Sequence, residues 1–215
     1  MLLQKIFISE MKRNSQSAEL PVMEAFYSIQ GEGYHQGKPA YFIRLAGCDV
    51  GCPWCDVKES WDAGQHPSAS VDKLVNEAGK SNAEIAVVTG GEPFMYNLDS
   101  LSNLLKKAGF QTHIETSGAY PITGKWDWIT FSPKKYKPPL AEFLDNCDEL
   151  KIVIFNKSDF NWAETYARKT HKKAKLYLQP EWSKAKVVIP LIVDYVKTHP
   201  KWEISLQIHK YMDIP

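Results

Sequence analysis

The sequence predicts an α/β fold whose mostly parallel sheet is either open or curled into a partial (β/α) barrel. Segments with strand-like apolar patterns alternate along the chain with amphipathic helical segments, the order that parallel sheets require. The apolar run at 84–91 ends in two glycines, which is typical of a strand buried on both faces. The length of 215 residues suits one domain. A chain of this size buries about 70% of its unfolded surface, so a sizeable hydrophobic core is available.

The elements are expected in a regular order after Pro21. Residues 22–29 and 40–47 have strand-like patterns and lead into a cysteine-rich loop. Residues 71–80 form an amphipathic helical pattern, and residues 98–109 place leucines on one helical face. The remaining elements are strands at 110–115, 126–131, 149–155, 174–180 and 202–207, and helices at 158–169 and 187–199.

Some elements have finer expectations. The helix that begins at residue 158 should open with a Ser/Asp cap. Pro190 should start or interrupt the following helix, because proline has no backbone N–H to donate. The last strand should alternate Trp202, Ile204 and Leu206 on one face.

Composition and charge limit the class of protein. Residues 1–20 are mixed and polar and are interpreted as an N-terminal extension, which leaves 21–215 as a single domain. Lysine plus arginine number 26 against 25 acids, a balance that argues against nucleic acid or an anionic membrane as a partner. No signal peptide and no run near the ~20 apolar residues of a membrane span is evident. We therefore expect a cytoplasmic protein with reduced thiols.

Three of the four cysteines fall within eight positions, as Cys48, Cys52 and Cys55. Thiolates are soft ligands that suit zinc or an iron–sulfur cluster. A structural zinc site would need a fourth ligand, and Cys147, the only other cysteine, is more typical of a small buried hydrophobe. A four-iron cluster held by three cysteines instead leaves one iron open to a small molecule.

The spacing C-x3-C-x2-C, with the aromatic Trp54 before the third cysteine, resembles the signature of the radical S-adenosylmethionine (SAM) superfamily. The segment "VVTGGEP", Val87 to Pro93, resembles the superfamily's motif for the SAM amino group and lies at the matching distance. The resemblance implies a [4Fe-4S] cluster on Cys48, Cys52 and Cys55 that cleaves SAM to a 5′-deoxyadenosyl radical. The bound cofactor supplies that chemistry, and the protein positions it.

Further segments narrow the resemblance to the 7-carboxy-7-deazaguanine synthase family. They are "FYSIQGEG", "YFIRLAGC", "TGGEP", "ETSG", "SPK", "LQPEW" and the ending "SLQIHKYMDIP", in order across 21–215. The resemblance implies a homodimer of partial barrels of the radical SAM type. Such a lyase converts 6-carboxy-5,6,7,8-tetrahydropterin to 7-carboxy-7-deazaguanine with release of ammonia, a step in queuosine and other 7-deazapurine biosynthesis. The electron donor would be a flavodoxin or another reductant.

The resemblance also implies ligand contacts, position by position. Substrate contacts would come from Ile29, Gln30, Gly31, Arg44, Thr89 and Pro215. SAM contacts would come from Trp54, Cys55, Asp56, Gly91, Ser132, Pro133, Lys134, Gln179, Pro180, Glu181 and Trp182. A planar arginine fork suits the pterin carboxylate and a side-chain amide suits the pterin edge, although Arg44 could equally form a structural ion pair and Gln30 could merely shape a turn.

The family's magnesium site is altered in this chain. The family has threonine after Cys-Asp, and Val57 stands there instead. A valine side chain has no oxygen for a hard cation, so any Mg²⁺ must rely on substrate oxygens, water or Asp56.

The resemblance implies that the chain end is part of the active site, although the segment could instead only seal the bottom of the barrel. The α-carboxylate of Pro215 would face the pterin, held by the apolar anchors Ile208, Tyr211, Met212 and Ile214.

Two other functions are compatible with parts of the pattern. A glycyl-radical-enzyme activase uses the same cysteine loop but acts on a protein partner. A zinc-dependent RNA-binding module could use the three loop cysteines with Cys147, and aromatics such as Trp126 and Trp128.

Overall fold

The computed structural model describes residues 18–215, so most of the N-terminal extension expected at 1–20 lies outside the described residues. One nine-stranded sheet runs through the described part of the chain in the order β3-β1-β2-β4-β5-β6-β7-β8-β9. Its strands are β1 Glu19–Ile29, β2 Pro39–Leu45, β3 Ser68–Ser70, β4 Ile85–Gly90, β5 Gln111–Thr116, β6 Trp128–Phe131, β7 Glu149–Ile154, β8 Lys175–Pro180 and β9 Glu203–Ile204.

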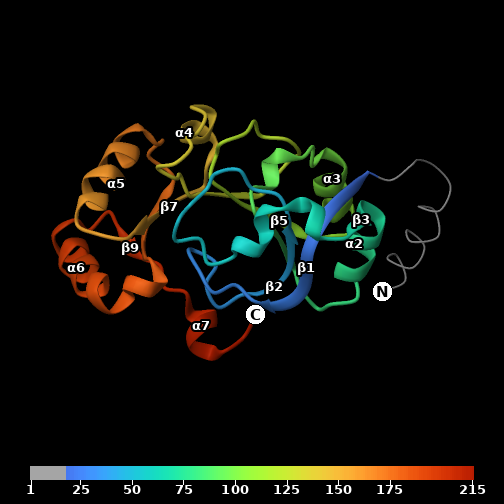
Figure 1. Cartoon of the computed structure of the whole chain (residues 1–215), viewed down its shortest axis with the longest axis horizontal. Helices are drawn as coiled ribbons and strands as arrows, with labels where there is room; N and C mark the ends of the chain where they lie inside the picture. Colours follow the sequence, from blue (N-terminus) through green and yellow to red (C-terminus); the bar gives the residue numbers. More distant parts are fainter. Residues whose placement is uncertain (1–17) are drawn as a thin grey trace.

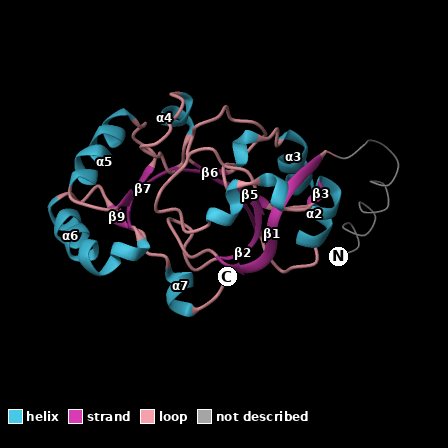
Figure 2. Ribbon diagram, in the orientation of Figure 1, coloured by secondary structure: helices cyan, strands magenta, loops and turns pink. Residues whose placement is uncertain are grey.

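Every strand pair from β2 to β9 is parallel, and only the pairs that β1 makes with β2 and β3 are antiparallel. The two edge strands, β3 and β9, do not pair with each other, so the sheet curls without closing. Figure 2 shows the strands as an arc with helices along its outer side. The predicted mostly parallel partial barrel is therefore confirmed.

Helices cover the convex side of the sheet (Figure 1). The covering helices are α2 Val71–Ala78, α3 Asp99–Lys107, α4 Glu142–Asn146, α5 Ser158–Lys169 and α6 Ala185–Thr198, and the short α7 Ile208–Met212 follows β9. Leu101 and Leu105 of α3 and Leu74 of α2 are buried in the main core, as their helical spacing predicts. No helix within the described residues has the length and apolar character needed to cross a membrane.

Strand alternation separates the core from the interior of the arc. Ile43, Ile114 and Ile152 point into the core beneath the helices. Their neighbours Arg44 and Lys151 point to the opposite face, where they line a cavity. The polar side chains of these mostly apolar strands therefore point to the concave face of the sheet.

Two predictions about helices are wrong, and a third, about the last strand, follows below. The predicted Ser/Asp cap of α5 does not form. Asp159 instead accepts the backbone N–H groups of Phe155 and Asn156 at 2.7 and 2.8 Å, and the Asn156 side chain accepts the N–H of Ser158. Pro190 lies inside α6, on its exposed side, where one missing helical bond is tolerated.

The last strand is only two residues long, because Ser205 and Gln207 turn inward and are buried while Leu206 is not. The first strand, by contrast, begins at Glu19, so β1 starts two residues before the expected domain boundary at 21.

Candidate functional site

A cavity of about 480 Å³ lies on the concave face, toward the carboxyl ends of the parallel strands. Ligands of open α/β sheets bind at this edge because the loops that follow the strands converge there. The expected site residues that line it are Ile29, Gln30, Gly31, Arg44, Cys48, Cys52, Trp54, Cys55, Asp56, Val57, Thr89, Gly91, Ser132, Lys134, Gln179, Pro180, Glu181, Trp182 and Pro215. Pro133 is the exception and lines an adjoining groove.

The cysteine loop leaves β2 and is fixed by backbone bonds at its base. Gly47 N–H donates to Ser60 O at 2.6 Å, and Cys48 N–H donates to Trp61 O at 3.1 Å. Among the described residues no three His, Cys, Asp or Glu side chains converge as a single-ion site does. Three thiolates of an iron–sulfur cluster bind three different irons of one cluster, and Cys48, Cys52 and Cys55 all line the same cavity.

Cys147 lies away from this loop, fully buried in the hydrophobic core. Burial raises the pKa of its thiol to about 12, so it remains protonated and apolar in character. It does not line the cavity.

The glycine turn after β4 lines the cavity and also packs tightly against neighbouring backbone. The close approach of a ligand to Gly90 and Gly91 stays a prediction, and their nearest protein neighbours are the end of β2 for Gly90 and the cysteine loop for Gly91. A Cβ on Gly91 would lie 2.2 Å from Gly47 O, and one on Gly90 would lie 2.0 Å from Leu45 O. The two motifs are therefore packed directly against each other.

Glu92 ties this turn to the end of β5. Its buried carboxylate accepts Thr116 Oγ1 at 2.6 Å, the Ser117 N–H at 2.8 Å and the Phe94 N–H at 3.2 Å. A carboxylate held by several donors has a fixed orientation. The "GGEP" and "ETSG" segments thus form one rigid support beneath the cysteine loop.

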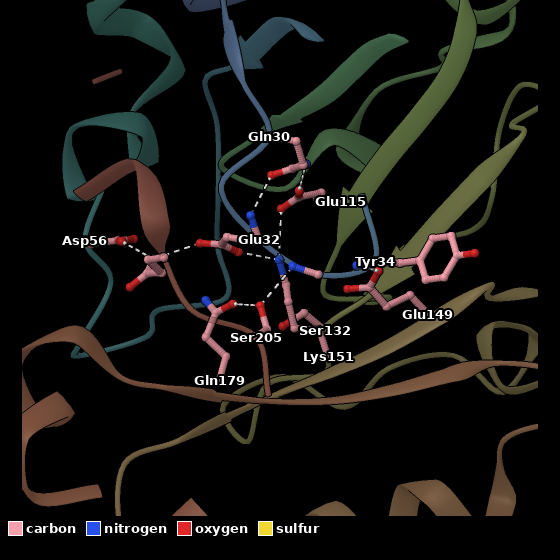
Figure 3. A network of polar contacts seen from close by, with 12 residues as sticks. Gln30, Glu32, Tyr34, Asp56, Glu115, Ser132, Glu149, Lys151, Gln179 and Ser205 are labelled. Carbon is pink, nitrogen blue, oxygen red and sulfur yellow. Dashed lines mark hydrogen bonds and ion pairs between the residues drawn. The ribbon is translucent and has the colours of Figure 1, made fainter. Parts of the chain in front are cut away.

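Figure 3 shows a buried polar network beside the cavity, centred on Lys151 of β7. The Lys151 ammonium bonds the carboxylate of Glu32 and lies 3.3 Å from Glu115 Oε2. Burial alone would raise the pKa of Glu32, but the Lys151 ammonium and the Gln207 amide lower it to about 2. The carboxylates of Glu115, Glu32 and Glu149 hold the pKa of Lys151 above its ordinary value despite burial, so the ammonium stays charged.

Arg44 forms the ion pair that the sequence left open as an alternative. Its Nε donates to Glu24 Oε1 at 2.6 Å across the β1–β2 pair. Both side chains line the cavity, so the terminal guanidinium nitrogens remain beside it.

The C-terminal segment packs onto the loop between β1 and β2. Ile208 N–H donates to Gly31 O at 3.0 Å, and a Cβ on Gly31 would lie 2.1 Å from His209 Nδ1. Ser28 Oγ donates to Pro215 O at 2.9 Å, which places the segment's end at the cavity.

Only part of the expected apolar anchoring of this segment exists. Tyr211 is 59% exposed and Met212 46% exposed, so neither is a buried anchor. The short α7 turns these side chains outward, and the ring of Tyr211 meets Trp182 edge to face at 5.2 Å. Polar contacts hold the segment instead, including Lys210 Nζ to Asp56 Oδ2 at 2.6 Å.

Comparison with known proteins agrees with this geometry. The Radical SAM superfamily model matches residues 42–151. A 7-carboxy-7-deazaguanine synthase from Flavobacterium psychrophilum is 57% identical over 91% of this chain and 93% of its own length. The chain belongs to the 7-carboxy-7-deazaguanine synthase family.

Other members of the family are also similar in sequence and structure. A 7-carboxy-7-deazaguanine synthase from Synechocystis is 48% identical over 90% of this chain and 93% of its own length. The crystal structure of QueE from Escherichia coli superimposes with a TM-score of 0.80 at 30% identity, covering 94% of this chain and 97% of that one. These matches support neither the activase nor the zinc-dependent RNA-binding module.

The residues of the cysteine loop fit the cofactors of a radical SAM family. Cys48, Cys52 and Cys55 line one cavity, and the aromatic rings of Trp54 and Trp182 lie beside it. The adjoining groove of about 740 Å³ is shared by Trp54, Trp182 and Pro133. Thiolates for iron and flat apolar walls for a nucleoside are therefore adjacent.

The residues after the cysteine loop do not fit the family's magnesium ion. Val57 lines the cavity with a hydrocarbon side chain. The neighbouring Asp56 carboxylate already accepts the Lys210 ammonium at 2.6 Å and the Gln207 amide at 3.3 Å. A divalent cation at this carboxylate would lie beside the Lys210 ammonium, and Val57 would offer it no oxygen.

Sequence reasoning assigned no role to Lys151, Glu115 and Gln207. Lys151 gives a recognisable signal, since it is the one charged residue of β7 with an apolar strand neighbour on each side, Leu150 and Ile152. Glu115 lies within the quoted "ETSG" segment without having been singled out. Gln207 gives no local signal, because its role depends on contacts with residues 151 and 175 positions away.

Proposed function

We propose that this protein is a 7-carboxy-7-deazaguanine synthase, a carbon–nitrogen lyase of queuosine biosynthesis that converts 6-carboxy-5,6,7,8-tetrahydropterin to 7-carboxy-7-deazaguanine and ammonia. The observation that supports this most directly is that the loop thiols and the Lys151 network line one cavity, in a chain 57% identical to a synthase of that name. When bound, a [4Fe-4S] cluster with SAM supplies a 5′-deoxyadenosyl radical that abstracts hydrogen from the pterin.

We assign the cluster to Cys48, Cys52 and Cys55 and the SAM contacts to residues on both sides of the boundary between cavity and groove. The Gln179 oxygen accepts Ser205 Oγ at 2.8 Å, which directs its amide N–H groups toward the cavity. Lys134 is held by Ser132 Oγ at 2.7 Å, and burial lowers the pKa of its ammonium. The remaining SAM contacts proposed are Trp54, Asp56, Gly91, Pro133, Pro180, Glu181 and Trp182.

We assign the pterin to the side of the cavity formed by the β1–β2 loop and the C-terminal segment. Gln30 offers an amide to the pterin edge, and Arg44 offers a guanidinium to its carboxylate. Ile29, Gly31, Thr89 and Pro215 complete this wall. His209 and Lys210 of α7 lie beside this wall.

Anaerobic incubation of the iron-reconstituted protein with SAM, dithionite and the carboxypterin tests the proposal. We expect 7-carboxy-7-deazaguanine and one equivalent of ammonia per pterin consumed, and neither product with a Cys52→Ala variant. SAM cleavage without pterin consumption by the wild-type protein would contradict the proposed substrate.

We further propose that the protein works as a homodimer in the cytoplasm and takes electrons from a flavodoxin or a similar low-potential donor, as its family resemblance implies. Light scattering after size exclusion tests the dimer, and a monomer with full turnover would exclude it. Turnover with reduced flavodoxin in place of dithionite tests the donor.

A further inference from the structure

Four residues beside the proposed pterin wall form a closed ring of hydrogen bonds (Figure 3). Gln30 Nε2 donates to Glu115 Oε1 at 3.0 Å, and the Lys151 ammonium bridges Glu115 and Glu32. The ring closes where the Glu32 backbone N–H donates to Gln30 Oε1 at 3.1 Å. All four residues also line the cavity.

The ring fixes the orientation of the Gln30 amide. Its oxygen faces an N–H donor and its nitrogen faces a carboxylate. If the amide were turned over, its NH₂ group would face the Glu32 N–H and its oxygen would face the Glu115 carboxylate. Both contacts would be repulsive, which is unfavourable at a buried site. Gln30 therefore has one N–H left for a ligand, and Glu115 has only acceptor lone pairs left.

Lys151 keeps the two carboxylates in this acceptor-only state. Its side chain is 5% exposed and bonds one oxygen of Glu32 and one of Glu115. Other charged groups that act on it are Glu149 on its own strand, the Lys134 ammonium and, through Glu32, His209 of the C-terminal segment. Without this ammonium, two half-buried carboxylates would face each other, and one of them would take up a proton.

The resulting pattern, one donor beside carboxylate acceptors, is complementary to an aminopyrimidinone. That ring edge presents a carbonyl oxygen, then a ring N–H, then an amino group. We propose that Lys151 is a positioning residue that selects the aminopyrimidinone edge by holding Gln30, Glu32 and Glu115 in a single donor–acceptor state. The inference rests on the proposed pterin substrate.

The test compares two ligands of the reconstituted, SAM-loaded protein by fluorescence titration. The probes are 6-carboxypterin and 6-carboxylumazine, which differ by an amino group replaced with a second carbonyl oxygen. We expect the wild-type protein to bind the pterin at least about tenfold more tightly, because the lumazine turns an acceptor toward Glu115. In Lys151→Met the ratio should fall below about threefold, since a protonated carboxyl can donate to the lumazine oxygen.

A charge-matched double variant separates selection from mere packing. In Lys151→Met/Glu32→Gln the new amide can donate to Glu115 in place of the ammonium, and no like-charged pair remains. We expect the double variant to recover most of the wild-type ratio. A purely structural Lys151 predicts that the double variant is worse than the single one, and that result would overturn the inference.

The remaining outcomes are also decisive. If Lys151→Met keeps the wild-type ratio, the inference is wrong while the proposed function stands. If Lys151→Met does not fold, the double variant is compared with the wild-type protein, and a ratio below about threefold counts against the inference. If the wild-type protein binds neither probe and forms no product, the proposed function fails first.

Discussion

Replacing Gly91 by alanine tests whether the two cofactor motifs depend on direct backbone packing. The new Cβ would lie 2.2 Å from Gly47 O and 2.9 Å from Cys48 Cβ, so the cysteine loop must retreat by about 1 Å. That movement also weakens the bond from Glu92 N–H to Gly47 O, now 2.8 Å long. Overpacking and the weakened bond together should lower the free energy of unfolding by about 2–4 kcal/mol.

The displacement should affect the cluster more than the fold. A misplacement of about 1 Å near reacting groups can reduce turnover about 100-fold. We expect Gly91→Ala to hold less than half of the wild-type iron after anaerobic reconstitution, measured per chain. Gly79→Ala is the matched control, because a Cβ there meets nothing closer than Val75 O at 3.4 Å. Wild-type iron content and turnover in Gly91→Ala would refute the packing argument.

Three further predictions concern single side chains. Burial raises the pKa of Glu149 to about 7 from 4.5, so the folded state retains a proton that the unfolded chain loses between these values. The free energy of unfolding should therefore fall by about 3 kcal/mol as the pH rises from 4.5 through 7. Urea unfolding of Glu149→Gln should lack this fall, and a variant with the same pH dependence as the wild-type protein would contradict the prediction. Cys147→Ala should keep its full iron content, and loss of the cluster would make that thiol a ligand. Chelators should leave turnover intact, and Val57→Thr should introduce a response to Mg²⁺; complete inactivation by chelators, unaltered in Val57→Thr, would contradict the reasoning.

The sequence predicted the central architecture well because parallel strands and their crossover helices are encoded locally. The parallel strands β4, β7 and β8 are short, mostly apolar runs, and each is recognisable without knowing its partner. The elements that were missed, β3, α4 and α7, have three to five residues, too few to establish a period. The error at β9 has a different cause, since its alternation is interrupted where Ser205 turns toward Gln179.

The site was predictable only where it depends on motifs. The cysteines and the glycine turn are recognisable from their spacing in the sequence. Both follow parallel strands, so they lie at the same edge of the sheet and line the cavity there. Lys151 and Glu32 are 119 positions apart, and neither residue indicates by itself that the other is its partner. Interactions of this kind are set by the register and curvature of the sheet, which no local pattern encodes.

The dependence of the β1–β2 loop on the far end of the chain has a consequence for biosynthesis. Glu32 and Gly33 bond Gln207 and Ser205, partners 175 and 172 positions later. On the ribosome, the first strands emerge long before these partners are translated. Contacts of such large sequence separation close costly loops and form late in folding. A nascent chain can therefore assemble most of its sheet while the β1–β2 loop is still unsupported, and the proposed pterin wall gains this support only after Ser205 and Gln207 have been synthesised.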